Sequence, residues 1–225
     1  MKLLPCYLRA GFKCGLRPTV VAAAFMVLIV APATARDLVG RYVAAEGPDV
    51  AGRMELTRDG RFLYALSAGA LDEQAQGRWI QRGAQACLTT APTPKPPEFQ
   101  PIAPTREQTS TVMVETRGGR GIPGVDLRIG FAVGEPLTGY TQAYGWTLPE
   151  DEKRVPLWIE LAEPIHRFAS PRFEIAADAR GRFRAVLIPN DIGTVNFQGA
   201  CLEAKGDHFV LHRREGDMRF RRVLR

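Results

Sequence analysis

The chain of 225 residues is poor in the side chains that enzymes most often use as nucleophiles and bases, with three serines and three histidines. None of the serines, Ser67, Ser110 and Ser170, stands in a G-x-S-x-G elbow, the signature of the α/β-hydrolases. The stretch GGRG at residues 118–121 lacks the lysine of a phosphate-binding loop, and we interpret it as a turn. We therefore expect no catalytic residues and no cofactor.

The sequence also lacks a convincing metal site. His208 and His212 have a spacing that would bring both imidazoles to one ion on a helix, but the apolar residues 209–211 between them predict a strand. A strand would hold the two histidines about 13 Å apart, at about 3.3 Å per residue, which is too far for one zinc ion. We interpret them as exposed histidines, and His166 as a loop residue.

Carboxylates cluster only in predicted loops, at residues 72–73 and 150–152. Neighbouring acids on a solvated loop seldom perturb one another enough for catalysis, so a solvated surface is the favoured interpretation. An enzyme is the least favoured class of function. It would require an acid and a base that the fold brings together from distant loops, for instance Asp72 with Asp191.

Long hydrophobic runs are absent apart from residues 20–31, which follow a basic segment without acids and precede Ala33-Thr34-Ala35. Twelve residues are too few to cross a bilayer core, which needs roughly 20 in a helix. The pattern predicts a cleaved export leader over residues 1–35, with an uncleaved anchor as the alternative. We expect a periplasmic or secreted protein without stable membrane insertion after cleavage.

Excess positive charge is largely a property of the leader, because its four basic residues account for most of the formal net charge of +6. The rest of the chain carries +2, so we expect no nucleic-acid partner. Arginines concentrate only at residues 212–225, where Met218 and Phe220 alternate with Arg219 and Arg221. This alternation predicts a closing strand with one buried face and one solvated basic face.

Cysteine is scarce, and two of the four residues, Cys6 and Cys14, lie in the leader. The other two, Cys87 and Cys201, predict one disulfide in an oxidising compartment, with two unpaired buried thiols as the alternative. The alternation of Val195, Phe197, Gly199 and Cys201 predicts a common buried strand face.

The remaining pattern predicts an all-β fold of antiparallel meanders that form a sandwich or a barrel. Turn residues recur every 8 to 12 positions, and Phe62, Tyr64 and Leu66 alternate with outward positions. The polar stretch at residues 70–76 is too short for a stable helix, and we assign it to a long loop. Six prolines between residues 91 and 104 predict a linker or a connection along a sheet edge, which we assign to residues 91–108.

A weak internal repeat relates the two ends of the chain. Gly60-Arg61-Phe62 matches Gly181-Arg182-Phe183 at an offset of 121, although a coincidence between common strand starts is the alternative. Each half holds few strands, so we expect residues 36–90 and 165–225 to share one β core, with a ligand entrance at loops 68–76 and 189–194. Three independent domains in a row are the alternative. The predicted core residues are Phe62, Tyr64, Leu66, Trp79, Phe173, Phe183, Leu187, Phe197, Phe209 and Leu211.

The middle segment, residues 109–164, contains GIPGVDL at 121–127, GYT at 139–141, GW at 145–146 and LWIEL at 157–161. In these motifs it resembles the carboxypeptidase-regulatory-like and transthyretin-like domains. The resemblance implies a small β-sandwich with a structural or binding role and no catalysis. The flanking halves are similar to lipocalin-like envelope proteins in their strand starts GRY, GRF and GRW.

The features together favour an exported, non-catalytic, β-rich binding module of the bacterial envelope, whose partner is a small ligand or an envelope protein. A structural or interaction protein of the envelope is the second interpretation. An enzyme with a loop-borne carboxylate site is the third.

Cleavage of the leader after Ala35 gives an exported protein that begins at Arg36. Intact-mass analysis of the exported protein is expected to show this shortened chain. Recovery of the full-length chain alone, in a membrane fraction, would contradict the prediction.

Overall fold

The computed structural model describes residues 37–179 and 181–223, so the predicted leader and its cleavage site lie outside the described residues. Within these two ranges the chain forms sixteen strands and one short 3-10 turn, Ala177–Ala179. The all-β prediction is therefore confirmed. Nowhere in residues 37–179 or 181–223 is there a helix of the length and apolarity that a membrane span requires.

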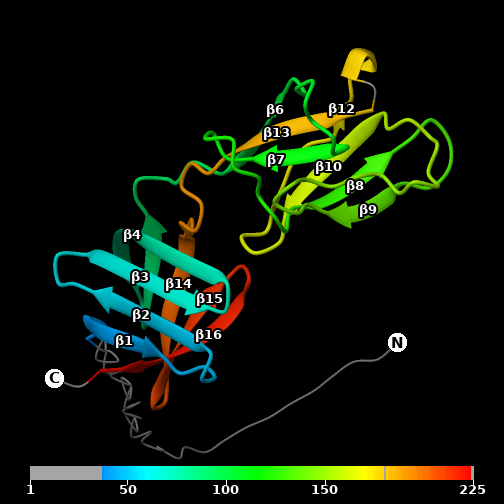
Figure 1. The fold of residues 1–225 in the computed structure, drawn as a ribbon. Coiled ribbons are helices and arrows are strands. Elements are labelled where there is room, and N and C mark those ends of the chain that lie inside the picture. Colours follow the sequence, from blue (N-terminus) through cyan, green and yellow to red (C-terminus); the bar gives the residue numbers. More distant parts are fainter. Residues whose placement is uncertain (1–36, 180, 224–225) are drawn as a thin grey trace, which may run out of the picture. The chain divides into compact units, whose positions relative to one another are not determined.

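Eight strands form a closed barrel (Figure 1). Each strand pairs in antiparallel fashion with the next one along the barrel, and β16 pairs with β1 to close the ring. The strands are β1 (Gly40–Ala44), β2 (Val50–Leu56), β3 (Arg61–Ala68), β4 (Leu71–Arg82), β5 (Gln85–Thr90), β14 (Gln198–Lys205), β15 (His208–Arg213) and β16 (Gly216–Arg222). The order is that of an up-and-down meander in which a long insertion separates β5 from β14.

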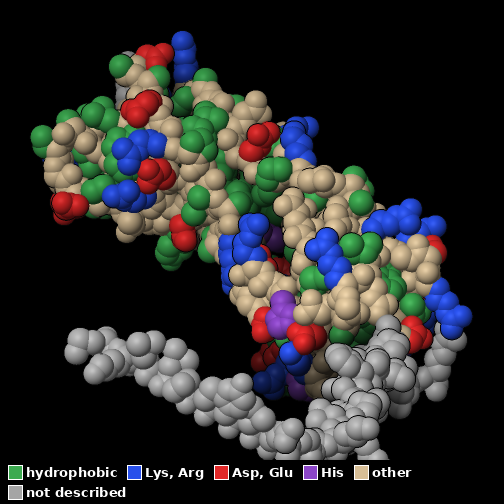
Figure 2. Space-filling model, turned by 180° about the vertical axis from the view of Figure 1, so that it is seen from behind, with side chains coloured by type: hydrophobic (Ala, Val, Ile, Leu, Met, Phe, Trp, Pro, Cys, Tyr) green, Lys and Arg blue, Asp and Glu red, His purple; other side chains and the backbone are tan. Residues whose placement is uncertain are grey.

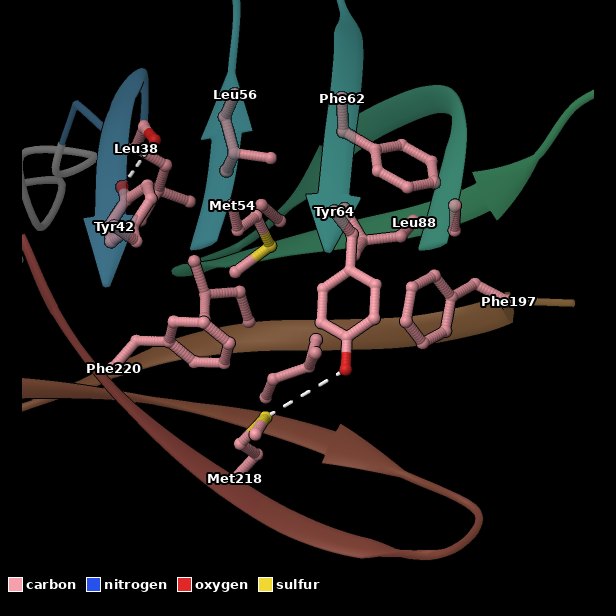
Figure 3. Packing of buried hydrophobic residues seen from close by; sticks show 14 of the residues in the cluster. Leu38, Tyr42, Met54, Leu56, Phe62, Tyr64, Leu88, Phe197, Met218 and Phe220 are labelled. Carbon is pink, nitrogen blue, oxygen red and sulfur yellow. Dashed lines mark hydrogen bonds between the residues drawn. The ribbon is translucent and has the colours of Figure 1, made fainter. Parts of the chain in front are cut away.

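Alternate residues of these strands fill the barrel with side chains (Figure 3). Tyr42 packs edge-on against Phe209 at 4.9 Å between ring centroids, and Tyr64 packs against Phe197 at 5.2 Å. The Tyr42 hydroxyl donates a hydrogen bond of 2.5 Å to the Leu38 carbonyl, which satisfies its polar end inside the core. Met218 and Phe220 are buried, as the alternation at the C-terminus predicted. The interior is a packed core.

The insertion forms a second hydrophobic core between two sheets. One sheet has the order β11-β10-β8-β9, with β12 also paired to β10, and the other has the order β6-β13-β7. The strand bounds are β6 (Glu98–Ile102), β7 (Val112–Glu115), β8 (Asp126–Gly130), β9 (Leu137–Tyr140), β10 (Trp158–Glu163), β11 (Phe168–Ala169), β12 (Phe173–Glu174) and β13 (Phe183–Ile188). Among the strands of the described residues, β7 and β13 alone form a parallel pair.

The structure corrects the predicted extent of the shared core. Strands β14 to β16 join the N-terminal half as predicted, but Phe173, Phe183 and Leu187 pack in the core of the insertion. The reason is long-range pairing, because β13 pairs with β6 and β7 and not with a barrel strand. The repeated GRF motif shares only its local structure, a turn glycine with positive φ at Gly60 and at Gly181.

Two predicted loops are strands. Residues 71–76 belong to β4, which continues the hairpin from β3 after a tight turn at Gly69. Their alternation places Ala75 inside the barrel, so the polar composition reflects an outward face and not a loop. The proline-rich segment contains β6 at the edge of its sheet, where Pro101 needs no amide donor toward a neighbouring strand.

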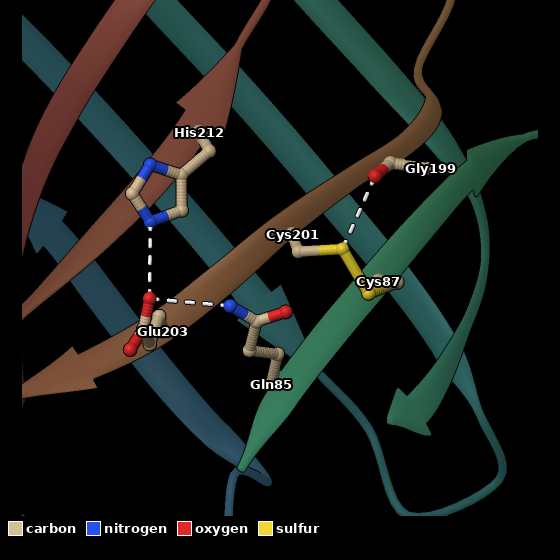
Figure 4. Close-up of a disulfide and its surroundings, with 6 residues drawn as sticks. All are labelled: Gln85, Cys87, Gly199, Cys201, Glu203 and His212. Atoms are coloured by element: carbon tan, nitrogen blue, oxygen red, sulfur yellow. Dashed lines mark hydrogen bonds and ion pairs between the residues drawn. A yellow bond between two sulfur atoms is a disulfide. The ribbon is translucent and has the colours of Figure 1, made fainter. Parts of the chain in front are cut away.

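A disulfide joins Cys87 to Cys201 across the pair β5–β14, where the two sequence-distant parts of the barrel meet (Figure 4). The two residues are direct cross-strand partners with a sequence separation of 114. Cys201 lies on the outward face, contrary to the predicted buried face shared with Phe197. A β-bulge between Gln198 and Ala200, with Gly199 at positive φ, shifts the alternation by one residue.

Removing the disulfide by the double substitution Cys87→Ser and Cys201→Ser is expected to lower the free energy of unfolding. The chain-entropy model gives about 4.7 kcal/mol for a loop of roughly 100 residues, which is an upper value for the loss. Urea unfolding of the oxidised protein and the double variant measures the difference. Equal midpoints and slopes would show that the bond does not stabilise the barrel.

Candidate binding surface

The two segments predicted to form a ligand entrance pair with each other through their backbones. The amide of Gln74 on β4 donates to the carbonyl of Gly193 at 2.8 Å, and the amide of Val195 donates to the carbonyl of Gln74 at 2.8 Å. The carboxylates of Asp72 and Asp191 have separate partners. Ser67 donates its hydroxyl to Asp72 at 2.6 Å, and the Lys95 amide donates to Asp191 at 2.7 Å.

One polar network lies inside the barrel near its end. The guanidinium of Arg213 donates to the Tyr64 hydroxyl at 2.5 Å and to the Glu73 carboxylate at 2.8 Å, and the Tyr64 hydroxyl donates to Glu73 at 3.1 Å. Arg213 and Glu73 expose only 9% and 14% of their side chains. Burial is the main cause that raises the pKa of Tyr64, so its phenol stays neutral. These groups satisfy one another, which is the usual arrangement of a structural buried ion pair.

A second polar cluster lies on the outward face beside the disulfide (Figure 4). His212 contacts Asp217 through Nδ1 at 2.8 Å and Glu203 through Nε2 at 3.2 Å. Gln85 and Lys205 donate to the same Glu203 carboxylate at 3.1 and 2.6 Å. Figure 2 shows histidine, acidic and basic side chains gathered together on the barrel. The cluster links four strands through charged hydrogen bonds.

The three histidines do not converge on a common point. His208 contacts Asp207 at 3.0 Å, and His166 contacts Glu163 at 3.0 Å in the turn that follows β10. In the described part of the chain, no group of three histidine, cysteine or acidic residues is arranged to hold a metal ion.

One concave feature of the barrel is a groove of about 760 Å³ over the outward faces of β1, β2, β3 and β4, which lie side by side (Figure 1). This volume falls within the usual range of ligand sites. Two rows of cross-strand neighbours form its floor. They are Val223, Arg41, Glu55, Leu63 and Gln76 in one row, and Val43, Arg53, Ala65, Gln74 and Thr194 in the other.

The groove combines apolar side chains with one uncompensated cation. Val43, Leu63 and Val223 expose 40%, 53% and 46% of their surface, although outward strand positions are usually polar. Arg41 pairs with Glu55 at 3.2 Å. The side chain of Arg53 has no ion pair or hydrogen bond within residues 37–179 and 181–223.

This groove was not predicted from the sequence, although part of its signal is visible in the strand pattern. Val43 and Leu63 occupy outward positions of strands whose inward positions are already apolar. Apolar residues on both faces of an antiparallel strand mark a surface that contacts something besides water. Gln74 and Gln76 were not recognised as strand residues, because the polar composition of their segment predicts a loop.

Comparison with known proteins leaves the function to be inferred from this geometry, since no family model, no curated protein and no solved structure matches the chain.

Protonation of His212 is expected to stabilise the fold. Its hydrogen bond with Asp217 is the main cause that raises the pKa of His212, with Glu203 contributing, while partial burial opposes the shift. A pKa that is higher in the folded than in the unfolded state gives stability that is fully present below about pH 6.5 and lost as the pH rises through the folded value.

The free energy of unfolding of the His212→Asn variant should therefore lie furthest below that of the native protein at acidic pH. The difference between the two free energies should become smaller above neutrality. Urea unfolding at a series of pH values measures it. His208→Asn is the matched control, because His208 is about equally exposed on the same strand and contacts one carboxylate only. A gap that stays constant or widens with pH would contradict the assignment.

Proposed function

We propose that this protein is an exported, non-catalytic binding module of the bacterial envelope that recognises its partner on the outer surface of the barrel. The observation that carries this proposal is the contrast between the two sides of β1 to β4. Their inward side chains pack into a filled core, while their outward side chains line a groove in which exposed apolar residues stand beside polar and charged ones. A partner is therefore accommodated outside the barrel.

The disulfide supports the proposed location. Such bonds persist in oxidising compartments outside the cytoplasm, and Cys87–Cys201 is one of them. Periplasmic location or secretion, by way of the leader at residues 1–35, is the finer proposal.

We also propose a likeness to a known family for the insertion and another for the barrel. Residues 109–164 are similar to carboxypeptidase-regulatory-like domains, and we assign the insertion a structural or binding role on that basis. The eight-stranded up-and-down order of the barrel supports the proposed likeness to lipocalins, while its packed interior favours a partner bound outside it.

A structural protein and an enzyme are less well supported. Asp72 and Asp191 each accept a local hydrogen bond, and the groups of the buried Tyr64–Glu73–Arg213 network satisfy one another. The groove offers a specific contact surface that a purely structural barrel does not require.

Site-specific photo-crosslinking in the intact envelope tests the proposal. A photoreactive amino acid replaces Leu63 in the groove or, as the matched control, Ile80 on the same barrel, which is 54% exposed and outside the groove. We expect a discrete adduct from position 63 that is absent from position 80 and is lost when Val43→Asp is added. Adducts from both positions, or from neither, would contradict a partner in the groove.

A further inference from the structure

We infer that the groove binds an extended peptide segment of another protein, about six residues long, with an acidic side chain between apolar ones. This inference rests on the proposed function and specifies the partner. Three features support the inference: the length of the groove, the side chains that line it, and the closure of the barrel.

The length of the groove matches a short extended chain. The row starts at Val223, the residue after β16, and crosses the four adjacent strands β1 to β4, where it ends at Gln76. Neighbouring strands lie about 4.8 Å apart, so the row is about 19 Å long. An extended peptide rises about 3.3 Å per residue, and about six residues therefore cover the row.

The polar side chains of the lining match a peptide with one carboxylate. Arg41 is already neutralised by Glu55, so Arg53 is the cation that remains available to an acidic group. Its neighbours across the strands are Val43 and Ala65, so a carboxylate at Arg53 has apolar surface on both sides. Desolvation by such neighbours strengthens a charged hydrogen bond.

The remaining lining suits a peptide better than a simple amphiphile. Gln74 and Gln76 are exposed on β4, and each carries an amide group that donates and accepts hydrogen bonds. A peptide backbone supplies complementary amides along its whole length, whereas an acyl chain supplies none. Leu63 and Val223 then contact apolar side chains on one face of the peptide.

Closure of the barrel disfavours recognition by strand addition. A peptide that adds to a sheet needs an open strand edge, and each barrel strand pairs with a neighbour on both sides over at least part of its length. Recognition in the groove then uses side chains across the strands. This makes the identity of the outward residues, and Arg53 above all, decisive for specificity.

Fluorescence anisotropy with labelled hexapeptides tests the inference on the exported protein, which begins at Arg36. The probe has the order serine, leucine, valine, glutamate, valine, leucine, and two analogues replace the glutamate by glutamine or lysine. We expect the glutamate peptide to bind roughly fivefold more tightly than the glutamine peptide, the effect of one exposed ion pair. Added salt should reduce this preference.

Two groove variants and two matched controls locate the site. Arg53→Glu should abolish the preference for glutamate and transfer it to the lysine peptide, while Arg82→Glu, at another exposed arginine of the barrel, should leave it unchanged. Leu63→Asp should weaken all three peptides about tenfold. Ile80→Asp, at an equally exposed apolar residue, should not.

Several outcomes would overturn the inference. One is equal affinity of the native protein for the three peptides. Another is an equal loss of peptide affinity in the Ile80→Asp and Leu63→Asp variants. Binding of palmitate in place of the peptides, with the same dependence on Leu63, would assign the groove to a lipid. If the peptides fail but the crosslink from position 63 persists, the binding function stands and only the peptide class is wrong.

Discussion

Pairing between β5 and β14 is the constraint on which the rest of the structure depends. It is the seam at which two stretches of chain separated by the whole insertion complete one barrel, and the Cys87–Cys201 disulfide fixes its register. Just beyond it, the Thr90 amide donates to the Phe197 carbonyl at 2.9 Å, so the chain leaves and re-enters the barrel at one point. The returning segment then pairs with Gln74 and completes one end of the groove.

Local alternation in the sequence was sufficient to predict much of the barrel. The period of two placed Phe62, Tyr64, Met218 and Phe220 inside, because an antiparallel strand with one solvated face requires it. It could not assign Phe183, whose preceding turn glycine and strand pattern match those of Phe62. The difference lies in which strands pair with it, and that depends on contacts between residues far apart in the chain.

The candidate site was harder to predict, because its rows run across the strands. Alternation identifies Val43 and Leu63 as outward residues, but their neighbours depend on the register of several hairpins. The compensation of Arg41 by Glu55 follows from the same register, as does the side chain of Arg53 having no ion pair or hydrogen bond among the described residues. A single turn placed incorrectly, as at residues 71–76, removes a whole strand from the surface.

The position of the insertion also determines the order in which the barrel can form. Strands β1 to β5 are made first and can form hairpins within themselves, which is fast because their contacts are local. The edge of β5 has no partner until β14 has been synthesised, more than 100 residues later. For that interval an unpaired strand edge is open to other chains. Both ends of the insertion meet beside the β5–β14 pair, so folding of the insertion brings β14 next to β5. A compact insertion therefore shortens the time during which the edge of β5 is exposed.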